Sequence, residues 1–251
     1  MGRKLRIVVC LAVLALVPCS PAAAQDALQL LHKMQQALGG ADKIAGIQDF
    51  EQSVRAETWD NDGHLHGTVR KRTRWVRPNI LRLDQVGPDD TYVLYFDGKT
   101  GWEILPDQSV ANLEGGELKF AEKYLRDFNL HLWLADRDTR YAIAPPALNV
   151  IAISVKGDST SKLEITLDPG TFLPVKQTAV SLSDPGNPVA SETRFDHWAA
   201  YGEVMFAERI TIFQEGKKAA DITVEQTKVN TGIKADDLAI KPSDRKPVMA
   251  W

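Results

Sequence analysis

The stretch that decides the fold runs from Gly63 to Pro106 and reads GHLHGTVRKRTRWVRPNILRLDQVGPDDTYVLYFDGKTGWEILP. Runs rich in β-branched and aromatic residues alternate with two sharp breaks, Arg77-Pro78-Asn79 and Asp97-Gly98-Lys99-Thr100. The chain bends at Pro78, because proline cannot donate to a β ladder and forces the preceding residue into extended geometry. Gly98 supplies the positive φ that a tight hairpin turn requires. The stretch therefore predicts consecutive antiparallel strands, ending near residues 76, 86, 96 and 105.

Five features follow one another along this stretch: Trp75, Arg77-Pro78-Asn79, Pro88-Asp89, the turn from Asp97 to Thr100, and Trp102. In this order they resemble the core of the LolA/LolB family of periplasmic lipoprotein carriers, an outer-membrane lipoprotein-sorting superfamily. The resemblance implies a mainly β (α+β) fold, in which a curved antiparallel sheet forms a half-open β-barrel. An N-terminal helix and a lid helix over the concave face complete the expected architecture. The rest of the chain matches the family in strand pattern alone.

The N-terminus has the parts of a secretory signal peptide. A basic start, Met1 to Lys4 with Arg6, precedes an apolar run from Ile7 to Val17, roughly half the ~20 residues needed to span a bilayer. Small residues from Pro21 to Ala24 then offer a cleavage site between Ala24 and Gln25. We predict that residues 1–24 are removed and that the mature protein is periplasmic.

The cysteines support the same assignment and leave one alternative. Cys10 and Cys19 both lie within the predicted signal, so the mature chain has no thiol for a disulfide, a metal or nucleophilic catalysis. Leu16-Val17-Pro18-Cys19 is close to a lipobox, and a lipid anchor on Cys19 is the alternative to cleavage. Pro18 stands where a lipobox carries a small residue, which favours cleavage.

The remaining chain reads as one domain. Apolar residues at helical spacing predict a first helix from Gln25 to Leu38, closed by Gly39-Gly40. Regular turn signals between short strands predict an antiparallel meander up to about residue 228. We assign residues 25–240 to a LolA-like half-barrel domain and residues 241–251 to a flexible tail.

The segment from Glu117 to Asp136 is predicted to be a second amphipathic helix with an aromatic face. The resemblance places a lid helix in this interval, where its apolar side chains would cover the open mouth of the sheet. A tightly packed interior without a cavity is the alternative. Together with three residues of the opening stretch, this face gives the candidate ligand-binding and lid residues: Arg77, Trp75, Trp102, Phe120, Tyr124, Phe128, Leu132 and Trp133.

Arg77 has two interpretations. The resemblance implies that this arginine hydrogen-bonds to the lid and couples it to the sheet. An arginine that only braces the bend at Pro78 is the alternative.

Motifs for catalysis are missing from the sequence. It holds no Gly-x-Ser-x-Gly elbow, no His-Glu-x-x-His motif, no P-loop and no dinucleotide-binding glycine pattern. His64 and His66 could face one ion from a strand, but no third ligand is identifiable, so two solvated histidines are favoured. The pairs Asp89-Asp90 and Asp236-Asp237 fit turns and caps better than acid/base work. We therefore expect no enzyme activity, no metal and no cofactor.

These features favour a non-enzymatic periplasmic carrier of lipid or of the acyl chains of lipoproteins, acting as a monomer with a partner protein in the inner or outer membrane. An envelope sensor or accessory interaction module with the same fold is the alternative. Loss of the signal's three basic residues lowers the formal net charge from −3 to −6. An acidic chain of this kind lacks the excess of positive charge that is typical of nucleic-acid-binding proteins. Arg70, Arg72 and Arg74 share one strand face, expected to be a solvated outer face, with contact to an anionic lipid or partner as the alternative.

Overall fold

The computed structural model describes residues 21–87, 91–105, 107–158, 161–181 and 189–241. The predicted signal up to residue 20, with Cys19, lies outside these ranges, as do Pro88-Asp89 and the tail from residue 242. The strands of the described part are β1 (Asp49–Trp59), β2 (Leu65–Val76), β3 (Ile80–Val86), β4 (Thr91–Phe96), β5 (Gly101–Ile104), β6 (Val110–Asn112), β7 (Tyr141–Ala147), β8 (Val150–Val155), β9 (Leu163–Leu167), β10 (Pro174–Ser181), β11 (Val189–Tyr201), β12 (Val204–Gln214) and β13 (Lys217–Val229). The helices are α1 (Pro21–Ala37), α2 (Ala41–Ala45), α3 (Gly115–Arg126), α4 (Asn129–Leu132), the 3₁₀ turn η1 (Ala135–Arg137) and α5 (Ala235–Ala239).

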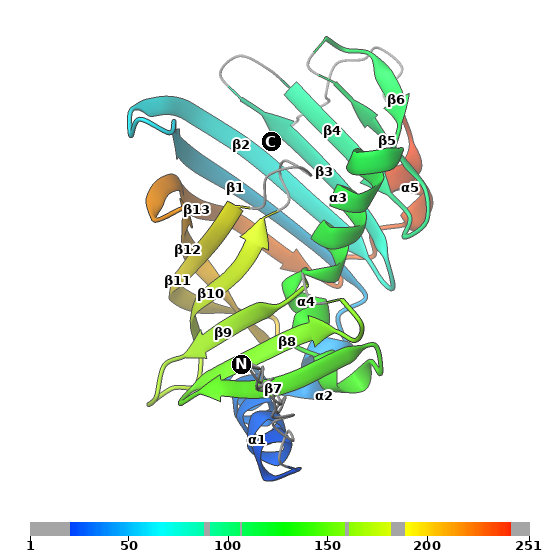
Figure 1. The fold of residues 1–251 in the computed structure, drawn as a ribbon. Coiled ribbons are helices and arrows are strands. Elements are labelled where there is room, and N and C mark those ends of the chain that lie inside the picture. The colour runs from blue at the N-terminus through cyan, green and yellow to red at the C-terminus, as the bar shows by residue number, and fades with distance from the viewer. Residues whose placement is uncertain (1–20, 88–90, 106, 159–160, 182–188, 242–251) are drawn as a thin grey trace, which may run out of the picture.

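All thirteen strands form one antiparallel sheet that curves without closing (Figure 1). The order β6-β5-β4-β3-β2-β1-β13-β12-β11-β10-β9-β8-β7 describes two meanders, joined where β1 pairs with β13. The two free edges are β6 and β7, and the segment between them in sequence crosses the concave face. Edge strand β7 contains Pro145 and Pro146, which an edge tolerates because its outer N–H groups need no ladder partner. The predicted fold class, an open half-barrel, is confirmed.

The two breaks in the opening stretch lie against each other. Asp97 closes its turn by accepting the backbone N–H groups of Lys99 and Thr100 at 2.8 and 2.7 Å. Gly98 has a φ of +95°, and a Cβ there would come 2.7 Å from the Cβ of Asn79. A glycine is therefore required both by the turn and by the close approach of the Arg77-Pro78-Asn79 bend.

The first helix packs one face against the sheet, as its spacing predicts. Leu31, Met34 and Leu38 are fully buried in the main core, whereas Leu28 is 38 % exposed. The helix begins at Pro21, so it includes the last residues of the predicted signal. Its end is set by Gly39, where a Cβ would lie 2.1 Å from the carbonyl oxygen of Glu203. Among the helices of the described ranges, none has both the length and the apolar character needed to cross a membrane.

The predicted single helix from Glu117 to Asp136 is wrong in its continuity. The chain forms α3, α4 and η1: Asp127 and Phe128 separate α3 from α4, and Trp133 and Leu134 separate α4 from η1. We call residues 115–137 the lid. Phe128 is extended, with φ −65° and ψ 131°. Its ring lies 5.6 Å from that of Phe50 and 5.8 Å from that of Trp75. This packing into the sheet outweighs the local preference for an unbroken helix.

The convex face carries a second, smaller core under α5. Val93, Trp102 and Ile104 are buried there, and α5 packs on β3. Arg82 fastens the helix, because its guanidinium donates to the carbonyl oxygens of Leu238 and Ile240 at 3.2 and 2.8 Å. The sequence analysis assigned Asp236-Asp237 to a turn or cap, and both residues lie in the first turn of α5.

Candidate functional site

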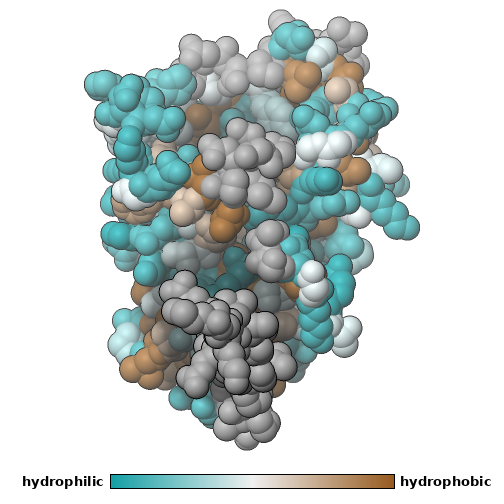
Figure 2. Space-filling model, viewed as in Figure 1, coloured by the Kyte–Doolittle hydropathy of each residue, from teal (hydrophilic) through white to brown (hydrophobic). Residues whose placement is uncertain are grey.

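A cleft of about 410 Å³ lies between the lid and the concave face of the sheet. This volume falls within the range of roughly 300–1,000 Å³ typical of small-molecule sites. Figure 2 shows hydrophobic residues toward the middle of the corresponding face of the molecule, with hydrophilic residues along its sides. The lining residues come from the lid and six strands: Phe50, Gln52, Val54, Lys71, Thr73, Phe120, Lys123, Tyr124, Asp127, Phe128, Asn129, Gln177, Ala179, Val180, Ser191, Thr193, Phe195, Ile210, Ile212 and Ile222.

The floor of the cleft is apolar because alternate residues of neighbouring strands face inward. Ile222 of β13 pairs with Ile210 of β12, which pairs in turn with Phe195 of β11, so the three form one row across the sheet. All three are only half-buried. The sheet therefore leaves large apolar side chains partly uncovered along this row.

The predicted aromatic residues divide between the cleft and the core beneath it. Phe120, Tyr124 and Phe128 line the cleft from the lid. Trp75 and Leu132 are buried in the main core, where Trp75 packs against Phe128 and His131. Trp133 is also buried, and it borders a space of about 50 Å³ that shares Phe50 and Phe128 with the cleft. A packed core and an open cleft thus coexist.

Trp102 lies apart from this group, on the convex face. It pairs with Tyr95 across β4 and β5, and their rings stack at 5.7 Å. The row that contains Trp75 instead runs through Leu81 and Phe96 to Gly101, one residue before Trp102. Since successive residues of a strand point to opposite faces, the two tryptophans are on opposite sides of the sheet. Trp102 therefore has no place in the cleft.

The Arg77 side chain contacts α2 and the segment between α2 and β1, and not α3. Its Nε donates to the carbonyl oxygen of Ile47 at 2.9 Å. One of its terminal nitrogens donates to the carbonyl oxygen of Ile44 at 3.4 Å. The guanidinium stands 5.1 Å from the ring centre of Trp75. Burial lowers the pKa of Arg77 from its ordinary value. In this arrangement Arg77 braces the bend and the end of α2.

The contact between the lid and the bend is made by His131, which the sequence did not single out. Its Nε2 lies 3.1 Å from the carbonyl oxygen of Pro78, and its ring packs at 5.6 Å from Trp75. Burial lowers the pKa of His131, with a further lowering from Arg77, against a raising effect of the Pro78 carbonyl.

Acid should destabilise the fold at His131, because burial disfavours the charged form of its imidazole. A lowered folded-state pKa means that neutral His131 contributes stability above its unfolded pKa of about 6.5, and that this contribution is lost as pH falls through the lower, folded value. We expect His131→Gln to reduce the drop in melting temperature between pH 7.5 and pH 5, measured by circular dichroism. An identical drop in wild type and His131→Gln would contradict the prediction.

Two lysines give the cleft a polar end. The Lys71 ammonium donates to the Tyr124 hydroxyl at 3.0 Å and stands 4.7 Å from the centre of its ring. Lys123 pairs with Asp127, which also accepts from Arg126 at 3.0 Å. Burial raises the pKa of Tyr124, but the charge and hydrogen bond of Lys71 outweigh it and lower the pKa overall. Strand alternation places Lys71 on the inward face with Trp75. The sequence pattern alone could therefore have identified Lys71 as a candidate cleft residue.

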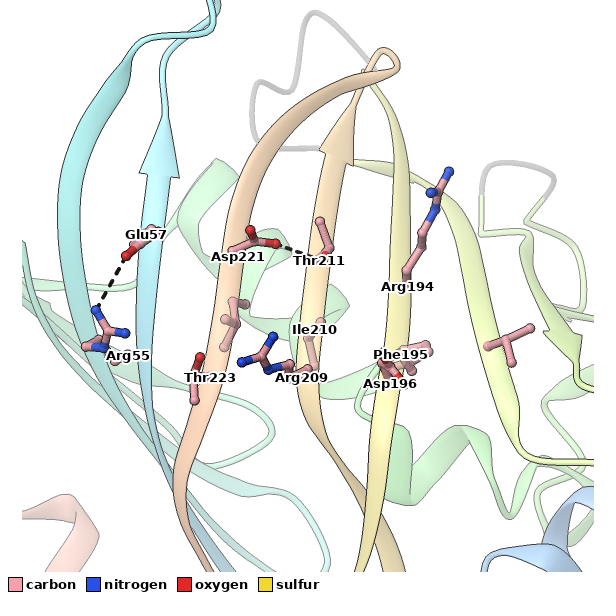
Figure 3. Close-up of a pocket in the computed structure, with 12 residues that line it drawn as sticks. Arg55, Glu57, Arg194, Phe195, Asp196, Arg209, Ile210, Thr211, Asp221 and Thr223 are labelled. Carbon is pink, nitrogen blue, oxygen red and sulfur yellow. Dashed lines mark hydrogen bonds and ion pairs between the residues drawn. The ribbon is translucent and has the colours of Figure 1, made fainter. Parts of the chain in front are cut away.

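The opposite face of the same strands carries a hollow of about 620 Å³ (Figure 3). Positive and negative side chains both line it, and Arg55 lies 3.6 Å from Glu57. The Asp221 carboxylate accepts a hydrogen bond from the Thr211 hydroxyl at 2.8 Å. Figure 3 looks onto this convex face, with the helices of the lid behind the strands. Although larger than the cleft, the hollow is a charged outer surface.

Arg70, Arg72 and Arg74 face the same convex side, as predicted. The latter two are less solvated than expected, since Arg72 pairs with Glu51 at 2.5 Å and Arg74 with the buried Asp84.

Within the described ranges, one group of side chains could hold a metal ion, Asp60, Asp62 and His64, whose ligand atoms lie within 4.8 Å of one another. All three are exposed. The Asp60 carboxylate accepts the backbone N–H groups of Asp62 and His64 at 2.9 Å, which is what a β-turn aspartate does without an ion.

No protein-family model matches the chain, and no curated protein matches it. Solved structures do. A domain of Vibrio parahaemolyticus named for outer membrane lipoprotein sorting is 12 % identical, with a TM-score of 0.55. A LolA superfamily protein of Nitrosomonas europaea is 14 % identical, with a TM-score of 0.57, and a DUF1329 family protein of Desulfovibrio piger is 12 % identical, with a TM-score of 0.59. Each comparison covers 86 % of this chain and 97 % of the other.

At these identities the comparisons speak for architecture alone. They bear out the resemblance that the motifs between Trp75 and Trp102 suggested: this chain has the LolA-like fold.

Proposed function

We propose that the protein is a non-enzymatic periplasmic binder and carrier of lipid, or of acyl chains attached to lipoproteins. The observation that carries this proposal is the apolar cleft under the lid, whose floor leaves Ile210, Ile222 and Phe195 half-buried. Large apolar side chains that stay partly exposed inside a cleft favour an apolar ligand, because covering them with an acyl chain removes their surface from water.

The open sheet explains why such a space remains. A closed small barrel fills its interior with its own side chains, whereas this sheet relies on α1 and the lid to cover its concave face. Beneath α4, side chains fill the interior around Trp75 and Leu132 and leave only a space of about 50 Å³. Beside α3 the larger cleft stays open. Each acyl CH₂ buried there would contribute about 0.8 kcal/mol, so part of a chain gives useful affinity without specific polar contacts.

The lining supports binding more than chemistry. Its polar members include the hydroxyls of Thr73, Ser191 and Thr193, and the lining residues include no histidine or cysteine to act as base or nucleophile. Export by the predicted signal, cleaved after Ala24, and delivery to a membrane partner belong to the same proposal. The named function of the Vibrio domain agrees with it through a shared fold only.

Co-purified lipid tests the proposal. We expect organic extracts of protein isolated natively from the periplasm to contain lipid by mass spectrometry. Ile222→Asp should lower the amount about tenfold or more, since a charge on the floor replaces an apolar contact worth roughly 1.5–3 kcal/mol.

The matched control is the next residue of β13. Thr223 is exposed on the convex face, in the hollow lined by Arg55 and Arg209, so Thr223→Asp should fold and retain lipid. Extracts of native wild-type protein without lipid would overturn the proposal. Equal lipid in both variants would show that the ligand lies elsewhere.

A further inference from the structure

Lys71 places a positive charge inside the apolar cleft. The side chain is half-buried, and its ammonium lies beside the ring and hydroxyl of Tyr124. An ammonium has three N–H donors, and the hydrogen bond to Tyr124 uses one of them. Burying a charge without a counter-charge is costly, so such a group calls for an anionic partner.

The described part of the chain provides no carboxylate within 4 Å of the Lys71 ammonium. Asp127 is the one acidic residue in the lining of the cleft, and its carboxylate is already engaged by Lys123 and Arg126. The lining therefore has two lysines against one aspartate, which leaves a net positive charge at this end.

Tyr124 adds a hydrogen-bond donor at the same point. Its phenol oxygen accepts a hydrogen bond from the Lys71 ammonium and interacts with the Thr73 hydroxyl, which helps to orient it. With its oxygen accepting, the Tyr124 O–H can point its proton toward a ligand in the cleft. Lys71 and Tyr124 both line the cleft, so their donors meet at one end of it.

The apolar floor starts next to this polar end. Lys71 of β2 pairs with Val54 of β1, and beyond β1 lie β13 and β12 with Ile222 and Ile210. Three strand spacings of about 4.8 Å separate β2 from β12, so the floor extends roughly 14 Å away from the ammonium. A site with a cationic end and an apolar extension matches an amphiphile with a negatively charged head.

We propose that Lys71, with Tyr124, binds the anionic head group of an amphiphile whose acyl chain lies on the floor formed by Ile222 and Ile210. The head carries carboxylate or phosphate oxygens, which accept charge-assisted hydrogen bonds from an ammonium. This inference rests on the proposed lipid-binding function and adds a selectivity that an apolar cleft alone would not have.

The test compares two probes with the same chain, dodecanoate and dodecanol, by isothermal titration calorimetry on delipidated protein. We expect wild type to bind dodecanoate about tenfold more tightly than dodecanol. Lys71→Met should remove the preference while it leaves dodecanol affinity within about twofold, because the apolar floor is intact. Lys123→Met is the matched control, since Lys123 is already paired with Asp127, and it should keep the preference.

A second variant guards against misfolding of Lys71→Met. Tyr124→Phe keeps the ring and its contact with the ammonium and removes only the hydroxyl, so it should reduce the preference severalfold. Dodecyl phosphate and inorganic phosphate distinguish the two sources of an anion. Tight binding of dodecyl phosphate supports the inference, whereas binding of inorganic phosphate alone with equal affinity would overturn it in favour of a free-anion site.

The outcomes separate the two proposals. If wild type binds dodecanoate and dodecanol equally, the head-group site is refuted and the lipid-binding function stands. If wild type binds neither probe, the proposed function itself fails.

Discussion

Trp75→Ala should destabilise the fold by about 3–5 kcal/mol, the usual cost of deleting a buried large aromatic side chain. Trp75 is 0 % exposed and joins the sheet to the lid through Phe128 and His131, with ring centres 5.8 and 5.6 Å away. Its Nε1 makes no hydrogen bond to any described residue, so the loss is one of packing. Urea denaturation followed by circular dichroism would measure the change in the free energy of unfolding.

Trp59→Ala is the matched control for this experiment. Trp59 ends β1, is only half-buried, and contacts Lys218 at 4.1 Å from its ring centre. A surface substitution of this kind should cost about 1 kcal/mol or less. A loss of similar size in both variants would mean that Trp75 is not the central packing contact between sheet and lid.

Asp84→Asn should lower the free energy of unfolding by about 3–5 kcal/mol. The substitution removes a negative charge and leaves the volume of the side chain almost unchanged. Asp84 is 2 % exposed on the convex face and pairs with both Arg74 and Arg82, the latter at 3.1 Å. Removing its charge leaves two largely buried guanidinium groups without a carboxylate between them. Because Arg82 also holds the carbonyl oxygens at the end of α5, hydrogen exchange in α5 should accelerate together with the loss of stability.

The control is Asp221→Asn, at a half-buried carboxylate of the outer hollow that Lys218 and Thr211 contact. Pairs of this kind are worth about 1 kcal/mol or less. The prediction for Asp84 fails if its substitution by asparagine costs no more than that of Asp221.

Local sequence signals were sufficient to predict much of the fold. Pro78 and Gly98 act within a few residues of themselves, so the bend and the turn that separate the strands could be predicted from sequence. The break in the lid could not, because nothing local at Phe128 opposes a helix. Its extended backbone is stabilised by the rings of Phe50 and Trp75, which are distant in sequence. For the same reason the prediction of one continuous helix was wrong.

The candidate site followed a similar division. Strand alternation put Lys71 on the face of Trp75, but its closeness to Tyr124 depends on where the lid settles. The placement of Trp102 could have been predicted, since it pairs with Tyr95 one position away from the row of Trp75. The volume of the cleft could not be predicted, because it depends on how side chains from six strands and the lid fill the space together.

The connectivity of the lid restricts how it can move. It links β6 to β7, the two free edges of the sheet, so it spans the mouth of the half-barrel from one edge to the other. Leu113, just before the lid, is held by a hydrogen bond from its N–H to the carbonyl oxygen of Gly101 at 3.0 Å, and Tyr141, just after it, begins β7. A segment fixed at both ends cannot swing away on one hinge. The contour length of the lid sets the widest possible separation of the two edges. That separation in turn limits the thickness of any ligand that the curved sheet can enclose.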